Sequence, residues 1–157
     1  MELLGAYLDA KRSEDIARLR RVVALRAMMA TGMIQRRVAT ELGVSQQAVS
    51  QQLKSAPDLD ALHPEVLLEA AAPVVRALAE ARGYTRLAVF GSVARHEAQD
   101  GSDIDLLVAA PEGISSFDFL RFQQLVEEVL GRAIDLVAYG GLQPGLDDDI
   151  RRDAVLL

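Results

Sequence analysis

The chain has 157 residues, half of them apolar, which is enough for one ordinary domain or two very small ones. It has no cysteine, which excludes disulfides and thiolate metal sites, and no apolar run approaches the roughly 20 residues that span a bilayer. The net charge of −6 conceals an asymmetry, because residues 1–56 carry +4 and residues 57–157 carry −10. A basic segment on an acidic body indicates two roles, one of them involving a polyanion.

The first 15 residues, MELLGAYLDAKRSED, carry acidic side chains and lack the basic-then-apolar order of a signal peptide. We therefore expect a cytoplasmic protein with no membrane partner. The next stretch, EDIARLRRVVALRAMMATG, predicts a helix that Ser13 caps at its start and Gly32 stops at its end. Apolar residues recur through it at helical spacing.

Residues 34–54 predict two short helices, at about 34–42 and 46–54, joined by a turn at Gly43-Val44-Ser45. Gly43 can take the positive φ of a sharp turn, Ala39 is small where two helices must cross, and Ser45 can cap the second helix. The apolar side chains expected to face inward are Val38, Leu42, Val44, Val49 and Leu53.

This pattern resembles the helix-turn-helix of bacterial transcription regulators. Gln52 departs from it, since repressor-type motifs often have an apolar residue there, and no wing follows. Glutamine can bond base edges, while basic side chains and hydroxyls reach phosphates. The alternative is a helical hairpin that only packs. The candidate DNA-binding residues are Arg36, Arg37, Ser45, Gln46, Gln47, Ser50, Gln51 and Lys54.

Residues 55–65 form a linker, and Pro64 suits the first turn of a further helix, which Pro73 should split or kink and Gly83 should end. Three strands are then predicted, at TRLAVFG, DIDLLVA and AIDLVAY. Between the last two, a helical stripe at Phe119, Phe122 and Val126 is typical of a core.

Three aspartates interrupt these apolar strands. Side chains alternate along a strand, so Asp103 and Asp105 point to one face, and Asp135 repeats the pattern on the third strand. If the strands pair, three carboxylates meet, and like charges on one sheet face repel. Such a cluster has raised pKa values or needs a cation, and Mg²⁺ or Mn²⁺ with oxygen ligands is the natural solution.

A Gly-Ser turn ends the first predicted strand. Gly91 allows the backbone to come close to a ligand, and a short helix starting near Ser92 would present free amides to a phosphate. Arg95 can add charge one turn later. Together with the carboxylates, this turn indicates phosphoryl or nucleotidyl transfer.

The stretch GSVARHEAQDGSDIDLLV resembles the signature of the DNA polymerase beta-type nucleotidyltransferase superfamily, and its short length resembles the minimal nucleotidyltransferases. The resemblance covers residues 84–157. It implies that Asp103, Asp105 and Asp135 bind metal and that Asp135 also acts as a base. It further implies that ATP or another NTP is the substrate and that Gly91, Ser92, Arg95 and Ser102 bind the nucleotide. His96 departs from a glycine common in minimal members, which affects the expected loop conformation.

The predicted fold is α+β: a helix-turn-helix domain at 1–57, a helical linker and first helix at 58–83, and a small mixed-sheet nucleotidyltransferase domain at 84–157. Minimal members often serve as antitoxins beside a helical toxin. The first hypothesis is thus an enzyme that moves a nucleoside monophosphate onto a hydroxyl of a co-encoded toxin and regulates its own operon. The alternative is a DNA-binding regulator whose second domain only binds nucleotide or partner. In both, a homodimer on a palindromic operator is expected.

Overall fold

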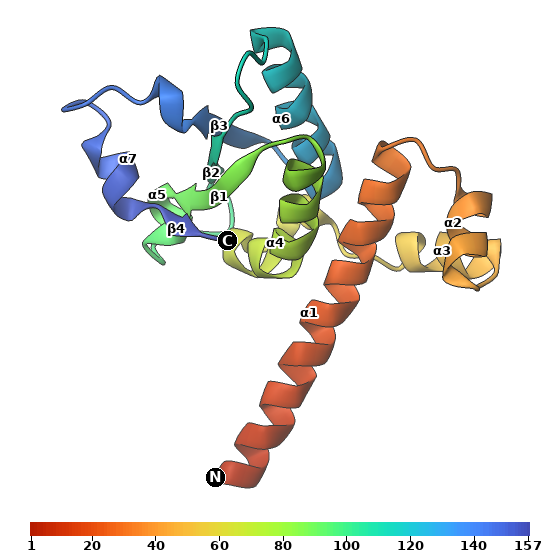
Figure 1. Ribbon diagram of the computed structural model, residues 1–157. Helices are drawn as coiled ribbons and strands as arrows, with labels where there is room; N and C mark the ends of the chain where they lie inside the picture. The colour runs from red at the N-terminus through yellow and green to blue at the C-terminus, as the bar shows by residue number, and fades with distance from the viewer.

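The structure of the chain, a computed structural model that describes residues 1–157, is α+β and is built on one four-stranded mixed sheet (Figure 1). The strand order is β3-β2-β1-β4, with β1 at Thr85–Phe90, β2 at Ile104–Ala109, β3 at Ile134–Ala138 and β4 at Val155–Leu156. β2 and β3 are parallel, whereas β1 is antiparallel to β2 and to β4. A parallel pair needs a crossover, and α6 (Ser116–Leu130) provides it.

Two helices, α4 (Pro64–Ala81) and α6, pack against one face of this sheet. Leu67 from α4, Val126 from α6 and Leu106 from β2 are fully buried in the same cluster of 23 residues, which we call the large core. The other face carries a smaller apolar group, Ala88, Leu107 and Leu142, beside η2 (Tyr139–Gly141) and α7 (Asp148–Asp153). The three predicted strands and the core role of the α6 stripe are confirmed. β4 was missed because two residues are too few to show a pattern.

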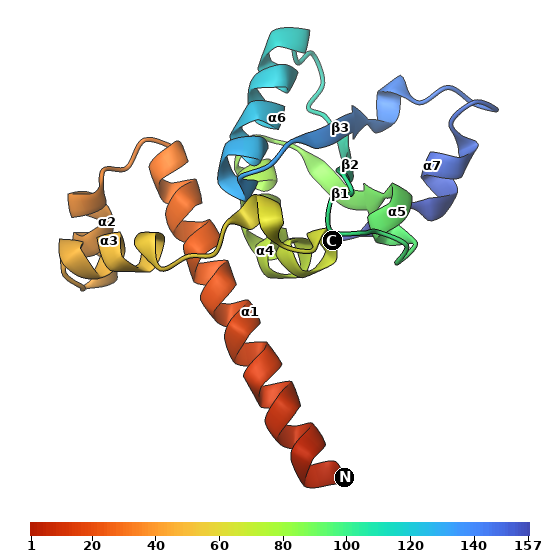
Figure 2. The same ribbon diagram turned by 180° about the vertical axis from the view of Figure 1, so that it is seen from behind.

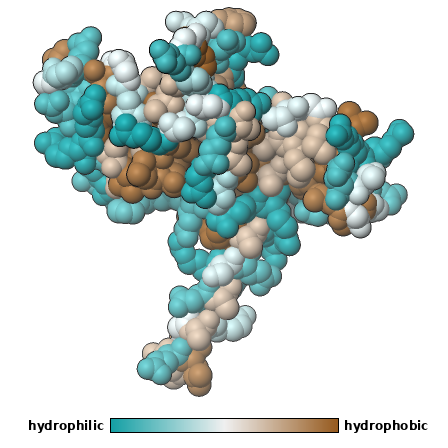
Figure 3. All heavy atoms as spheres, viewed as in Figure 1, coloured by the Kyte–Doolittle hydropathy of each residue, from teal (hydrophilic) through white to brown (hydrophobic).

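The longest element is α1 (Glu2–Ala30), a rod of 29 residues that runs along α4 and projects beyond the body (Figures 1 and 2). Its C-terminal half contributes Leu19 and Val23 to the large core and Leu25 to a second, smaller one. Its N-terminal end is exposed, and Figure 3 shows hydrophobic residues among hydrophilic ones at that tip. None of the helices is both long enough and apolar enough to cross a membrane.

The predicted start of this helix is wrong. Ser13 does not cap it, because the helix already begins at Glu2 and continues through Ser13 without a break. Residues 2–12 contain leucine, alanine, lysine and arginine, which are good helix formers, and no proline. Each residue added to an existing helix gains a hydrogen bond at little entropic cost, so a local capping signal does not interrupt it.

The two short helices are α2 (Gln35–Leu42) and α3 (Gln46–Lys54), as the sequence indicates. Gly43 has φ of +69° in the turn, and the Ser45 hydroxyl accepts a hydrogen bond of 3.0 Å from the Ala48 amide. Two of the five side chains expected inside are exposed, however. Leu42 and Val44 are 48% and 42% exposed, because α1 is the main element that packs on this pair and the turn lies outside that contact.

The expected break at Pro73 does not divide the helix, since α4 continues through it. Proline lacks an N–H, so the Glu69 carbonyl one turn earlier loses its intrahelical donor. The side chain of Arg20 on α1 replaces that donor, because Nη2 bonds the Glu69 carbonyl at 3.1 Å and Nε bonds the Ala70 carbonyl at 2.8 Å. The tertiary contact therefore satisfies a backbone group that the local sequence leaves unpaired.

Candidate active site

The strand register brings two of the three aspartates side by side. In the parallel β2–β3 pair Asp105 lies opposite Asp135, and in the antiparallel β1–β2 pair it lies opposite Phe90, the residue before Gly91. Ile104 and Ile134, the neighbours of these aspartates, are buried in the large core. Because side chains alternate along a strand, both carboxylates point to the opposite face, away from α4 and α6.

Asp103 precedes β2 and is exposed. It is close enough to act on Asp105, whose pKa is raised to about 6 from 3.8. The largest cause is burial, followed by a hydrogen bond with the Asp135 side chain and the like charges of Asp135 and Asp103. The three carboxylates do not converge into a ready ligand set, because nowhere in the chain do three or more His, Asp or Glu side chains gather closely enough to hold an ion.

No basic side chain is in direct contact with these carboxylates, since none of the ion pairs in the chain involves Asp103, Asp105 or Asp135. The site is also open, because Asp103 and Asp135 are exposed. Five clefts of the molecule, of about 220 to 680 Å³, are lined by other residues. The result is an accessible patch of negative charge at the N-terminal ends of β2 and β3.

The Gly-Ser turn lies directly against Asp105. Gly91 starts the short helix α5 (Gly91–Ala94) with φ of +72°, a conformation that favours glycine. A Cβ atom at this position would collide with the Asp105 carboxylate oxygen Oδ2. Glycine is therefore required here for its conformation and for its lack of a side chain. Ser92, the next residue, is half-buried.

Arg95 and His96 follow this turn. Arg95 is near enough to lower the pKa of Asp105, but its guanidinium is bonded to Glu97 at 3.0 Å and to Asp153 of α7 at 2.9 Å. His96 has φ of +58°, the left-handed conformation that a glycine at this position would favour. Its Nδ1 lies 2.6 Å from Oε1 of Glu65.

Ser102 takes part in the structure of the loop before β2. Its hydroxyl accepts a hydrogen bond of 2.8 Å from the Gln99 amide, and its carbonyl accepts one of 2.9 Å from Arg132. Arg132 was missed from the sequence, although it is the one charged residue among the buried side chains. The available signal was an arginine between a helix-ending glycine and an apolar strand, in LGRAIDL.

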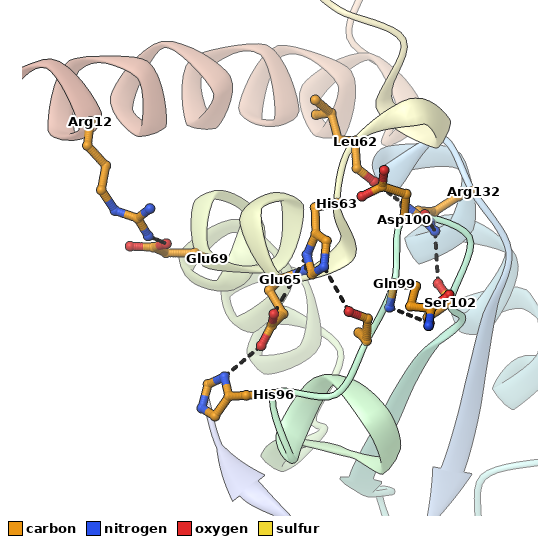
Figure 4. A network of polar contacts seen from close by, with 11 residues as sticks. Arg12, Leu62, His63, Glu65, Glu69, His96, Gln99, Asp100, Ser102 and Arg132 are labelled. Atoms are coloured by element: carbon orange, nitrogen blue, oxygen red, sulfur yellow. Dashed lines mark hydrogen bonds and ion pairs between the residues drawn. The ribbon is translucent and has the colours of Figure 1, made fainter.

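His63 also has a structural role that the sequence did not show. It caps α4, where its Nδ1 accepts from the Glu65 amide, and its Nε2 bonds the Ala98 carbonyl at 2.9 Å. Figure 4 shows this histidine, Arg132 and the loop before β2 together.

The predicted DNA-binding face is accessible. Gln46, Gln47 and Gln51 on α3 are exposed, and Ser50 is half-buried. Gln51 also bonds the Ser55 hydroxyl at 2.9 Å. Arg36, Arg37, Ser45 and Lys54 are exposed as well. DNA binding by these residues stays a prediction.

Comparison with known proteins links the second part of the chain to a family. Residues 73–157, more than half of the chain, match the family described as the nucleotidyltransferase domain. A candidate protein adenylyltransferase of Methanocaldococcus jannaschii is 44% identical over 73 residues, which cover 46% of this chain and 78% of that protein. The protein adenylyltransferase MntA of Thermococcus cleftensis is 36% identical over 78 residues, covering 50% and 79%. A solved structure described as a candidate minimal nucleotidyltransferase is 40% identical, with a TM-score of 0.53, covering 66% of this chain and 99% of that one.

Proposed function

The chain belongs to the nucleotidyltransferase domain family, and from this premise we propose that it transfers a nucleoside monophosphate from ATP or another NTP to a hydroxyl group of a protein. One observation carries the proposal. Asp105 and Asp135 lie opposite each other on parallel strands, Asp105 lies directly against the Gly91 turn, and neither carboxylate forms an ion pair. The names of the relatives as protein adenylyltransferases support a protein acceptor and AMP.

The residues fit a divalent metal ion in chemistry. Carboxylate oxygens are the preferred ligands of Mg²⁺ and Mn²⁺. Burial raises the pKa of Asp105, and the neighbouring Asp135 and Asp103 raise it further, so a bound cation would favour its charged form. Asp103, Asp105 and Asp135 would hold the ion. When bound, it would neutralise the triphosphate and share its oxygens. Because the three side chains have not converged, we expect nucleotide and metal to bind together and draw Asp103 inward.

The chain's own residues would then divide the work. Gly91 lets the triphosphate approach the backbone, and Ser92 offers a hydroxyl donor. Arg95 exchanges Glu97 and Asp153 for phosphate oxygens. The acceptor oxygen forms a bond to the α-phosphorus, the bond to pyrophosphate breaks, and the hydroxyl proton passes to the carboxylate of Asp135. Pyrophosphate is the leaving group.

The acceptor must come from another molecule. The site is open at the N-terminal ends of β2 and β3, and none of the five clefts described above is lined by its aspartates. We propose a tyrosine, serine or threonine of a co-encoded helical protein, which makes this chain the antitoxin of a pair. Co-expression followed by mass spectrometry should show the partner with the mass of one or more AMP residues. Asp103→Asn and Asp105→Asn should abolish the addition. A partner that is bound but unmodified would show a binding domain without catalysis.

A second function, DNA binding, has its own observation. The exposed face of α3 carries glutamines, and two arginines lie next to it on α2 in a segment of charge +4. Gln46, Gln47 and Gln51 would read bases, while Arg36 and Arg37 would contact phosphates. One such unit has a small footprint, so we propose a homodimer on two half-sites about 34 Å apart.

Arg36→Ala tests this second function in a gel-shift titration at several salt concentrations. It should weaken binding to all sequences and reduce the salt slope by about one unit. Gln47→Ala should instead change the preferred sequence. A wild-type protein that gives no salt-sensitive shift of the promoter fragment of its own gene would remove the proposal.

A further inference from the structure

Arg132 has an unusual environment. It is 9% exposed and lies between the end of α6 and the start of β3, two residues before the β3 strand that carries Asp135. None of the ion pairs in the chain involves it. Its guanidinium is satisfied by backbone carbonyls only. A buried charge without an anion is costly, so its hydrogen bonds must offset that cost.

These carbonyls belong to two different segments (Figure 4). Nη1 donates to the Leu62 carbonyl at 2.9 Å, just before α4. Nη2 donates to the Ser102 carbonyl at 2.9 Å and, at 3.4 Å, to the Asp100 carbonyl. Ser102 directly precedes Asp103, so one side chain at the start of β3 holds the entry to β2. The planar fork of arginine can span two such segments, whereas a lysine ammonium is a point donor.

The same loop, residues 98–103, has few other anchors. His63 bonds the Ala98 carbonyl at 2.9 Å, and Ser102 and Gln99 bond each other within the loop. Gln99, Asp100, Gly101 and Asp103 are exposed, so packing does not fix their positions. Ile104, buried in the large core, fixes Asp103 from the side of β2, and Ala98 packs against the same core at the other end of the loop. Between these two points, the hydrogen bonds of Arg132 are the contacts that tie the loop before Asp103 to the rest of the chain.

We propose that Arg132 is a positioning residue that fixes the 98–103 loop and so keeps Asp103 near enough to Asp105 and Asp135 for all three to close on a metal–nucleotide complex. The inference rests on the transferase function proposed above. Arg132 acts through backbone carbonyls and touches neither substrate nor metal. Outer residues that orient the ligands of a metal typically change its affinity by about 10- to 100-fold when altered.

Arg132→Lys tests the proposal against a matched control, Arg20→Lys. Arg20 also bonds two backbone carbonyls through its guanidinium, but these lie on α4, across the sheet from the aspartates. In both variants the guanidinium that bonds two or more carbonyls is replaced by a lysine ammonium. Both variants are expected to have a lower unfolding temperature than the wild type. Only Arg132→Lys should alter the loop and the site.

Two readouts separate positioning from general stability, at a temperature where all variants are folded. The first is amide hydrogen exchange of the metal-free protein, which should become about tenfold faster at residues 98–103 in Arg132→Lys and stay unchanged in Arg20→Lys. The second is calorimetric binding of ATP at increasing Mg²⁺. The half-saturating Mg²⁺ concentration should rise about tenfold or more in Arg132→Lys alone.

Loop exchange and Mg²⁺ dependence equal to wild type in Arg132→Lys would overturn the proposal, and so would equal changes in Arg20→Lys. If the wild type binds ATP without regard to metal, the proposed function fails instead, and the exchange measurement still decides whether Arg132 fixes the loop. Arg132→Gln, which is neutral and shorter, provides a second variant should Arg132→Lys not fold.

Discussion

Two of the three hydrophobic clusters of the molecule differ greatly in size. The large core around the sheet contains 23 buried residues, whereas the small core beneath α2 and α3 contains Leu25, Val38, Ala39 and Val49. One of these four, Leu25, belongs to α1, which is anchored in the large core through Leu19, Val23 and Ala27. The packing of α2 and α3 therefore depends on α1, which the large core holds in place.

This difference shows what each part can tolerate. The large core accepts unneutralised carboxylates on its strands, because the burial of many apolar side chains outweighs their repulsion. The small core buries far fewer apolar side chains, so α2 and α3 should open locally while the sheet stays folded. The expected domain boundary near residue 57 stays a prediction. The unbroken helix α1 contributes side chains to both cores, so it packs on both sides of that boundary.

Leu67→Ala should have the largest effect, because this side chain is fully buried in the large core. Removing it leaves a cavity, and the free energy of unfolding should fall by about 3 kcal/mol. Urea denaturation followed by circular dichroism measures this. The control is Leu3→Ala, at a site that is 82% exposed, which should change stability by less than about 0.5 kcal/mol.

Val49→Ala should break the small core alone. Val49 is fully buried, and the loss of two methyl groups should cost about 2 kcal/mol. Hydrogen exchange should accelerate in α2 and α3 but not in β1 or β2, because the sheet does not depend on this contact. Val44→Ala, in the exposed turn, is the matched control. Equal acceleration in the strands would mean that the two cores unfold as one unit.

Asp105→Asn should change how the stability of the sheet part of the chain depends on pH. The folded protein binds the Asp105 proton more tightly than the unfolded chain, because burial and then Asp135 raise its pKa to about 6 from 3.8. In the metal-free wild type, the free energy of unfolding therefore falls as the pH rises from 3.8 to about 6, because Asp105 loses its proton. The loss of stability persists above pH 6. Asp105→Asn has no carboxylate to ionise at this position, so it should be more stable than the wild type at pH 7.

The measurement is urea denaturation of both proteins between pH 4 and pH 7 without divalent metal. A stability difference that does not change with pH would contradict the assignment of the raised pKa to Asp105. Mg²⁺ added together with ATP should stabilise the wild type at pH 7 more than it stabilises Asp105→Asn, because binding to the folded state adds to stability.

Removal of residues 1–10 should have the smallest effect. Leu3, Leu4, Tyr7 and Leu8 are more than half exposed, and the nearest tie to the body is the ion pair of Arg12 with Glu69 at 2.6 Å, which the truncation keeps. The free energy of unfolding should change by less than about 0.5 kcal/mol. A much larger loss, measured by the same denaturation, would show that this end of α1 is covered in solution.

Much of the candidate site was predictable from residues near one another in the sequence. Gly91, Asp103 and Asp105 fall within one motif, and the repeat of Ile-Asp-Leu at 104–106 and 134–136 indicates strands that share a face. The register that places Asp105 opposite Asp135 follows that repeat. Glycine at 91 was expected from backbone freedom, and the structure adds the contact with Asp105 that also requires it.

The sequence by itself determined the element types, the two strands with alternating aspartates and the turn at Gly43, because these depend on local periodicity and on the conformations open to single residues. Only the tertiary structure decided three other features. Helix α1 runs unbroken through Ser13, and α4 continues past Pro73, where Arg20 bonds the carbonyl that the proline leaves without a donor. Arg132 bonds the loop before Asp103. Each of these depends on hydrogen bonds or packing between segments far apart in the chain, and the partners of such contacts are fixed when the segments meet, not by their own sequence.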